Sequence, residues 1–217
     1  MSRPPKQPDR STVSGDEVEA FDAVIDRERR MSGGASAAPD EAFQATPFVG
    51  ALLTSPPLAA LCAQMGTFVR TAGNRSDSYS HADREFVDQV LSADWQTTVV
   101  QRMHIVDAVG AGVRLEAIEA LRYHHEEDLT DDERLLATYV RQVVSGGVDD
   151  ETYGRMEARL GARGLVEYTG FILWLGWIIR MMQALGIRGP SEEELDRIVE
   201  QLRSGGDLGQ DYEARLV

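Results

Sequence analysis

Basic side chains are scarce in this sequence relative to acidic ones. The 217 residues include 36 Asp and Glu against 22 Lys and Arg, which gives a formal net charge of -14. A surface of this sign repels phosphate backbones and anionic lipid headgroups, so we expect neither nucleic acid nor a membrane as partner. Hydrophobic residues make up 42% of the chain, enough for one buried core. A chain of this length is expected to form one domain.

Cysteine is nearly absent, since Cys62 is the only one. A single thiol excludes an intramolecular disulfide and a CxxC redox pair, and it favours a cytoplasmic protein. The sequence also lacks a glycine-rich phosphate loop, a nucleophile elbow and the ligand spacing of a zinc site. We therefore expect no cofactor and no metal.

Long hydrophobic runs are missing as well. The first residues, MSRPPKQPDRSTVSG, are polar and contain no apolar segment, so we expect a disordered tail there and no signal peptide. The most apolar stretch is TGFILWLGWII, from Thr169 to Ile179. It is well short of the ~20 residues that a membrane-spanning helix needs. We interpret it as part of a helix buried in the core or between subunits.

No segment keeps the apolar and polar alternation of a strand, whereas helical periodicity recurs along the chain. The sequence therefore predicts an all-α fold, a single-domain bundle of about eight to nine helices. Expected helix starts carry capping pairs, namely Ser80 with Asp83, Thr130 with Glu133, and Ser191 with Glu194. We divide the chain into a disordered tail (1–15), an N-terminal helix and loop (16–44), the helical domain (45–203) and a C-terminal tail (204–217).

One expected helix, in the stretch TTVVQRMHIVDAVGAGV, ends at Gly112 and carries a single histidine, His104. The small apolar side chains of Val100 and Ala108 lie one helical turn either side of it. Burial in such surroundings disfavours the charged ring, and a neutral imidazole can accept a proton as a general base does. Asp107, three residues on, can orient the ring. The alternative interpretation is a core or interface histidine bonded to a backbone carbonyl.

Three segments, taken in order, resemble a known family. In the first segment a Ser-Pro pair leads into an expected amphipathic helix: FVGALLTSPPLAALCAQMGTFVR. In DREFVDQVLSADWQTTVVQRMHIVDAVGAGVRLEAIEAL, Arg84 and Glu85 open one helix, and His104 lies eight residues before Gly112. The third segment contains three expected helices. They are LTDDERLLATYVRQVVSGG, the short DDETYGRMEARLG and the long apolar GLVEYTGFILWLGWIIRMMQALG. Together these segments, roughly residues 45–187, are similar to the carboxymuconolactone decarboxylase-like, or alkylhydroperoxidase-like, family.

The departures from that family restrict the chemistry. Redox members carry a CxxC where this chain has Thr97 and Val100, so peroxide reduction by a cysteine pair is excluded. Another group has a Glu-Trp pair where this chain has Val100-Gln101. The last helix has Trp174-Leu175 in place of paired tyrosines, and Gln183 in place of an asparagine. The expected site is therefore more apolar than in the family.

The resemblance implies a small-molecule enzyme that performs acid-base chemistry, of the decarboxylase, lyase or isomerase type, without redox cysteines or a cofactor. His104 would be the general acid or base, and Glu85 would orient it or share the proton. Thr97, Val100, Gln101, Trp174 and Gln183 would line a largely apolar substrate pocket. The alternative is a binding or assembly protein of the same fold without the chemistry, and a weaker alternative is hydroperoxide reduction through Cys62.

The resemblance also implies a homo-oligomer, a trimer or hexamer. The stretch 164–185 is apolar on more than one face, so its side chains cannot all turn toward one partner helix. The side chains concerned are Phe171, Ile172, Trp174, Leu175, Ile178, Ile179 and Met182. We expect a subunit interface to cover part of this surface.

Two other clusters have simpler interpretations. The run YHHEEDLTDDE places His124 and His125 beside three acidic residues, but adjacent histidines point in different directions, so a solvated turn is favoured over a metal site. The stripe formed by Trp174, Trp177, Met181 and Met182 is typical of core or subunit packing.

Overall fold

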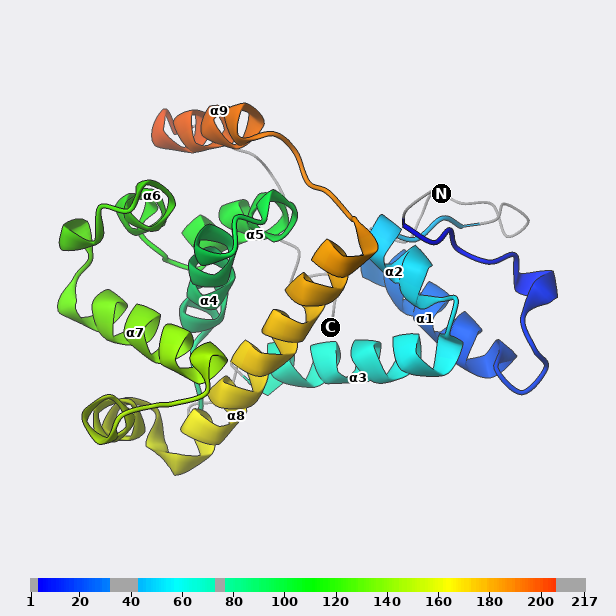
Figure 1. Ribbon diagram of the computed structural model, residues 1–217, viewed down its shortest axis with the longest axis horizontal. Helices are drawn as coiled ribbons and strands as arrows, with labels where there is room; N and C mark the ends of the chain where they lie inside the picture. Colours follow the sequence, from blue (N-terminus) through cyan, green and yellow to red (C-terminus); the bar gives the residue numbers. More distant parts are fainter. Residues whose placement is uncertain (1–3, 32–42, 73–76, 206–217) are drawn as a thin grey trace. The chain divides into compact units, whose positions relative to one another are not determined.

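The computed structural model of the chain describes residues 4–31, 43–72 and 77–205 (Figure 1). Within this part the chain forms nine α-helices and two short 3-10 helices, without a strand. The all-α prediction and the expected number of helices are confirmed. By their internal contacts the residues separate into two compact units, which are described one at a time.

The first unit comprises residues 1–67, 182–187 and 211–217. It contains α1 (Val18–Met31), α2 (Pro47–Leu52), most of α3 (Pro56–Ala72) and the end of α8. α1 buries Phe21, Val24 and Ile25 along one face, as its periodicity predicts. This unit includes described residues from both predicted N-terminal segments, 1–15 and 16–44. It also includes α2 and most of α3, which the sequence predicts to belong to the helical domain 45–203.

Residues 4–15, expected to form a disordered tail, have defined contacts within the first unit. The side-chain amide of Gln7 donates to the carbonyl of Phe43 at 2.8 Å and accepts from the N–H of Ala45 at 2.9 Å. Arg10–Thr12 form a 3-10 helix. The prediction of a disordered tail is therefore wrong for these residues, because hydrogen bonds to residues far along the chain fix their position. Residues 1–3, most of the predicted loop at 32–47, and most of the predicted C-terminal tail lie outside the described residues.

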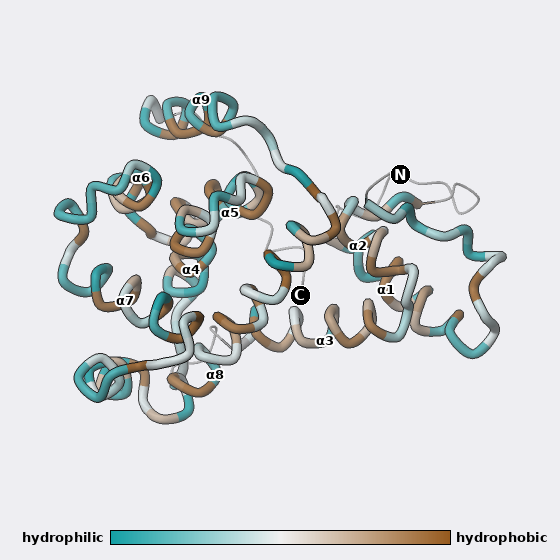
Figure 2. The backbone as a smooth tube through the Cα atoms, viewed as in Figure 1, coloured by the Kyte–Doolittle hydropathy of each residue, from teal (hydrophilic) through white to brown (hydrophobic). Residues whose placement is uncertain are grey.

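The second unit comprises residues 68–181 and 188–210. Its helices are α4 (His81–Asp94), α5 (Thr98–Gly110), α6 (Leu115–Tyr123), α7 (Asp131–Ser145), most of α8 (Asp150–Leu185) and α9 (Glu192–Arg203). α4 packs against α5, α6 and α7, and α9 packs against α5 and α6. The alternation of apolar and polar residues along α9 is visible in Figure 2, and its apolar face buries Leu195 and Val199.

The predicted helix starts are largely confirmed. Ser80 and Thr130 each accept a bond from the N–H three residues on, and the acidic side chains of Asp83 and Glu133 return the bond. Ser191 likewise accepts from the N–H of Glu194. The end of α5 also follows the prediction, since the next residues pass through a glycine, Gly112, with a φ of 101°.

α8 contains one break in its helical backbone. Gly161 adopts a φ of 69° and a ψ of 164°, so the element consists of a short and a long helical segment, as the sequence predicts. By length and composition alone α8 is apolar enough to cross a membrane, a test that core helices of soluble proteins also pass. Half of its most apolar window is buried inside the protein.

The apolar residues of α8 that suggest a subunit interface are mostly buried within the chain. Phe171, Ile172, Leu175, Ile178, Ile179 and Met182 are all buried. In the long segment of this helix, after Gly161, the large apolar side chains that are exposed are instead Val166, Leu173 and Trp177. An oligomer formed through α8 would therefore use these three residues rather than the predicted set.

α4 is the most deeply buried helix of the second unit, although its sequence is not apolar. Every residue from Asp83 to Ser92 is buried. Six of these are polar or charged, namely Asp83, Arg84, Glu85, Asp88, Gln89 and Ser92. Because buried polar groups are costly unless they are paired, the partners of these six side chains define the chemistry of the unit.

Candidate functional site

α4 and α5 form a helical hairpin whose shared face is polar. Only three residues connect the helices, and the middle one, Gln96, has a φ of 51°. On α4, Glu85, Asp88 and Gln89 lie on one face because they are three and four residues apart; on α5, Gln101 and His104 do the same. We call these five residues the polar seam.

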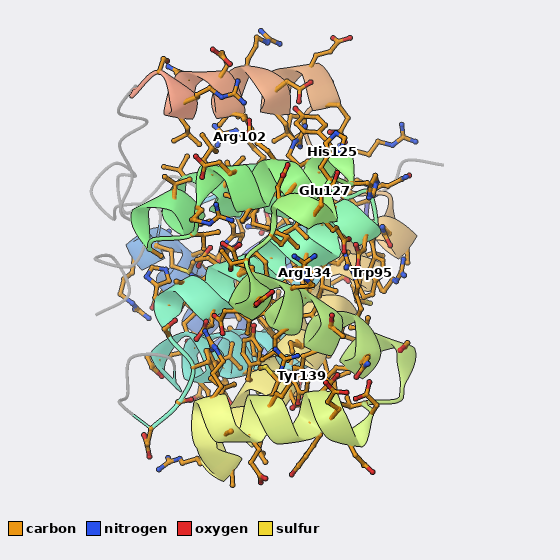
Figure 3. All side chains as sticks on the ribbon, turned by 90° about the vertical axis from the view of Figure 1, so that its left-hand side faces the viewer. Trp95, Arg102, His125, Glu127, Arg134 and Tyr139 are labelled. Atoms are coloured by element: carbon orange, nitrogen blue, oxygen red, sulfur yellow. The ribbon has the colours of Figure 1, made fainter. Side chains whose placement is uncertain are left out.

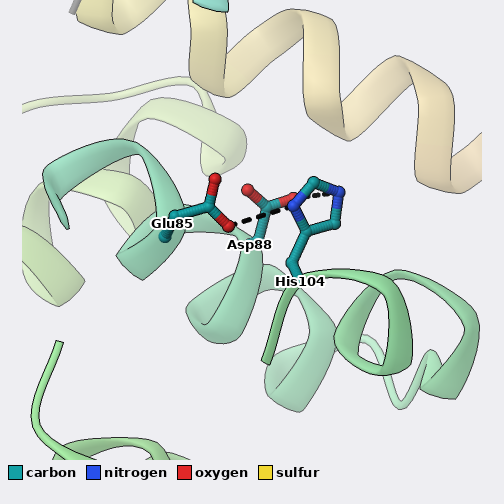
Figure 4. Close-up of side chains that lie close together, drawn as sticks. All are labelled: Glu85, Asp88 and His104. Atoms are coloured by element: carbon teal, nitrogen blue, oxygen red, sulfur yellow. Dashed lines mark hydrogen bonds and ion pairs between the residues drawn. The ribbon is translucent and has the colours of Figure 1, made fainter. Parts of the chain in front are cut away.

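Glu85 and His104 are in direct contact across the polar seam (Figure 4). Oε2 of Glu85 lies 3.0 Å from Nδ1 of His104. The Glu85 side chain is 1% exposed and the His104 side chain 14% exposed, so the ring is the part of the pair that reaches the surface. Because Glu85 is an ionised acceptor, Nδ1 carries the proton of this bond, which leaves Nε2 for other partners. The predicted pairing of these two residues is thus present.

Glu85 has two further polar neighbours on its own helix. Oε1 accepts from Arg84 at 3.0 Å and lies 3.3 Å from Nε2 of His81. Burial raises the pKa of Glu85, but the charge and hydrogen bond of His104, the bond to His81 and the charge of Arg84 lower it by more. The pKa of Glu85 therefore lies well below its ordinary value. Arg84 is anchored in turn, because it also donates to the carbonyl of Arg70 at 3.0 Å.

Asp88 is a second carboxylate at the same ring, and it is absent from the residues that the sequence predicts for the site. Its Oδ1 lies 3.8 Å from Nε2 of His104, beyond hydrogen-bonding distance, and its side chain is 3% exposed. No hydrogen bond to this carboxylate occurs within the described part of the chain. Burial raises its pKa to about 6, with the charge of Glu85 adding to the rise and that of His104 opposing it. The signal is readable in the sequence, since Asp88 follows Glu85 by three helical positions.

The two carboxylates reverse the expected protonation of His104. Burial lowers the pKa of the ring, as the sequence predicts, but the charges of Asp88 and Glu85 raise it by more. The pKa of His104 therefore lies above its ordinary value, so the ring keeps its proton to a higher pH than an isolated imidazole does. Asp107, expected to orient the ring, is half-buried on the same helix, and Glu85 makes the bond to the ring instead.

The predicted lining residues on α5 are buried in the hairpin. Thr97 is 7%, Val100 2% and Gln101 3% exposed. The amide of Gln101 donates to Gln89 at 3.4 Å and accepts from Arg122 at 2.6 Å. Gln101 therefore connects the polar seam to α6, and the largely apolar environment expected for His104 is not what surrounds it.

The predicted lining residues on α8 are not joined to His104 by a hydrogen bond or ion pair in the described structure. Trp174 is half-buried beside Phe171, with 6.3 Å between the ring centroids, and its indole nitrogen is buried without a hydrogen-bond partner among the described residues. Gln183 is exposed and belongs to the first unit. The structure thus brings together Glu85 and His104, and it replaces the α8 residues with Asp88 and Arg84.

The histidine-rich turn between α6 and α7 is solvated, as the sequence favours. His124 and His125 are exposed, and Figure 3 shows His125 near Glu127 on this turn. Nδ1 of His125 lies 3.8 Å from Glu127, and the two side chains are 63% and 75% exposed. Within the described residues, the histidine and acidic side chains close enough to hold a metal ion are instead Glu85, Asp88 and His104.

Comparisons with protein-family models, curated proteins and solved structures find no match to this chain. The resemblance to the carboxymuconolactone decarboxylase-like family therefore remains a prediction from its three sequence segments. Function has to be inferred from the polar seam itself.

Proposed function

We propose that the protein is a small-molecule enzyme of the decarboxylase, lyase or isomerase type, in which His104 transfers a proton. The observation that carries this proposal is the bond between Nδ1 of His104 and the shielded carboxylate of Glu85. A carboxylate bound at one ring nitrogen fixes the tautomer and orientation of the imidazole and leaves the other nitrogen to exchange a proton.

The electrostatics favour His104 as the acid of the reaction. Asp88 and Glu85 stabilise the imidazolium, and the charge of Arg70 opposes part of this effect. Nε2 has no hydrogen bond to Asp88 at 3.8 Å, so its proton is available to a substrate oxygen or carbon. Once the ring has given up this proton, the neutral imidazole can take one back, which completes an acid-base cycle.

Solvent deuterium incorporation provides a test that does not require the substrate to be identified first. The protein would be incubated in D2O with a panel of carbon acids chosen by chemistry, namely β-keto acids, unsaturated lactones and enolisable ketones, and followed by proton NMR. We expect incorporation or turnover with at least one class, and its loss in His104→Gln. His125→Gln, at an exposed histidine, is the matched control. Turnover that survives His104→Gln would contradict the assignment.

One observation favours the alternative of a binding or assembly protein without catalysis. Thr97, Val100 and Gln101 are all buried in the α4–α5 hairpin, so they offer little surface to a substrate. In that case the polar seam would serve to fix the register of the two helices. No reaction across the whole panel, together with loss of stability in His104→Gln, would support this alternative.

A further inference from the structure

We propose that Glu85, Asp88 and His104 form a binding site for one divalent transition-metal ion. The three side chains offer one imidazole nitrogen and two carboxylate oxygens, and these donor atoms all lie within 4.8 Å of one another. Donors bonded to one ion at about 2.1 Å are separated by roughly 3–4 Å, so small side-chain movements bring the three into coordination. Such a set of ligands lies on one side of the ion and leaves positions open for water or a substrate.

The carboxylate of Asp88, buried without a hydrogen bond from the described residues, is the independent observation that points to a bound cation. Its side chain is 3% exposed, it receives no hydrogen bond from the described residues, and it faces Nε2 of His104 at 3.8 Å. A buried carboxylate without a hydrogen bond is costly, and such groups are normally paired or coordinate metals. A metal ion between Asp88 and His104 would bind this carboxylate at coordination distance, which the ion pair with His104 at 3.8 Å does not reach.

The remaining contacts of the cluster are compatible with such an ion. Arg84 donates to Oε1 of Glu85, so this oxygen can keep its bond to the guanidinium while Oε2 turns from Nδ1 of His104 to the ion. The partial exposure of the His104 ring, 14%, provides the side from which an ion enters. Metal binding releases the proton of His104, and the two carboxylates with a neutral imidazole then carry a charge of -2, which a divalent ion balances.

The mixture of donors determines the class of metal. Imidazole suits Zn²⁺, Fe²⁺, Ni²⁺ and Cu²⁺, whereas carboxylates suit Mg²⁺, Ca²⁺ and Mn²⁺. A site with one nitrogen and two carboxylate oxygens is therefore expected to prefer Zn²⁺ and Mn²⁺ over the hard ions Mg²⁺ and Ca²⁺.

The metal site goes beyond the proposed function and shares a residue with it, because an ion on His104 occupies a nitrogen that proton transfer uses. Metal and proton would compete for the ring, so a bound ion would inhibit the acid-base reaction. Binding is measured without any substrate, however. A failure to bind metal would leave the acid-base proposal standing, and a failure to find turnover would leave the metal site standing.

Isothermal titration of EDTA-dialysed protein with ZnCl₂, and electron paramagnetic resonance with MnCl₂, test this site directly. We expect one equivalent of ion to bind to the wild type. We expect Asp88→Asn, Glu85→Gln and His104→Gln each to weaken binding at least tenfold, because each removes a ligand while keeping the side chain's size. Binding of Mg²⁺ and Ca²⁺ should be at least tenfold weaker than that of Mn²⁺.

His125→Gln and Glu127→Gln are the matched controls, since they remove a histidine and a carboxylate from the exposed turn. They should leave the affinity unchanged, and circular dichroism melts would confirm that each variant is folded. Wild-type protein that binds neither ion at millimolar concentration would overturn the proposal. So would folded Asp88→Asn protein that binds Zn²⁺ as tightly as the wild type, or binding that is lost only in the turn variants.

Discussion

Nδ1 of His104 lies 3.0 Å from Oε2 of Glu85, and the carboxylate in this pair is almost fully shielded from water. Shielding makes the interaction between the two charges strong, but it also makes each charge dependent on the other. The stability of the second unit and the chemistry of the ring therefore cannot be altered separately.

Removal of the ring tests this dependence. We expect His104→Ala to lower the free energy of unfolding by about 1–3 kcal/mol at pH 7, because Glu85 and Asp88 lose their shared cationic neighbour and the ring leaves a cavity. The exposed His125→Ala should change it by less than about 0.5 kcal/mol. Urea unfolding of both variants measures the difference. Equal stability of His104→Ala and wild type would show that the pair contributes nothing to folding.

Asp88 gives a pH dependence with a defined sign. Its pKa in the folded protein is about 6, against 3.8 for an ordinary aspartate, so folded protein holds this proton more tightly than unfolded protein does. Stability from this group is complete below about pH 4 and is lost as the pH rises through about 6. In metal-free protein, Asp88→Asn should therefore be more stable than wild type at pH 7.5 by up to about 3 kcal/mol.

The difference in free energy of unfolding between Asp88→Asn and wild type should shrink towards zero near pH 4, where the wild-type carboxyl is already protonated in the folded state. Unfolding curves of the two proteins across this range measure the effect. An advantage of Asp88→Asn that grew as the pH fell would reverse the assigned direction of the pKa shift.

Gly189 is predicted to tolerate no side chain. A Cβ at this position would lie 2.3 Å from the backbone nitrogen of Val99 and 2.6 Å from the carbonyl carbon of Thr98, at the start of α5. Backbone atoms cannot rotate away, so Gly189→Ala should cost more than about 2 kcal/mol. Gly154, inside α8, has nothing within 4 Å of the position that a Cβ would take. Gly154→Ala should stabilise the helix by about 0.5–1 kcal/mol.

Thermal melts of the two glycine variants decide this prediction, since the substitution is the same and only the surroundings differ. A Gly189→Ala protein that melts at the wild-type temperature would show that the segment before α9 does not pack against the start of α5.

The exposed apolar residues of α8 predict self-association. Leu173 is 52% and Val166 72% exposed on the helix whose most apolar window is half buried inside the protein. We expect the wild type to elute above its monomer mass of 23.9 kDa in size exclusion with light scattering, and Leu173→Glu to shift it to the monomer. Leu61→Glu, at an exposed leucine of α3, is the control and should leave the mass unchanged. A wild-type monomer at every concentration would refute the prediction.

Local sequence signals predict the helices and their ends well. Ser80 and Thr130 cap their helices through bonds to residues three positions on, and a glycine follows the end of α5. These signals depend on neighbours within one turn, so the sequence alone is enough to predict them. The prediction of a disordered tail at Gln7 is wrong for the opposite reason. Its partners lie 36 and 38 residues away, and no local pattern reveals them.

The candidate site is predicted in part. The pairing of Glu85 with His104 follows from the family resemblance, and Asp88 could be added from its helical spacing. The effect of the surroundings on the charge of the His104 ring could not be predicted, because it depends on distances to two carboxylates that are set only when the hairpin packs. The burial of polar residues along α4 is equally hidden, since sequence patterns assign charged side chains to the surface.

The short connection between α4 and α5 has a consequence for folding kinetics. Glu85 and His104 are 19 residues apart, so their contact closes a small loop at low entropic cost. The bond between Arg122 and Asp196 spans 74 residues and requires α9 to return across the unit. We expect the hairpin to form early and the α9 contact late, so the Glu85–His104 pair is assembled before most of the fold that encloses it.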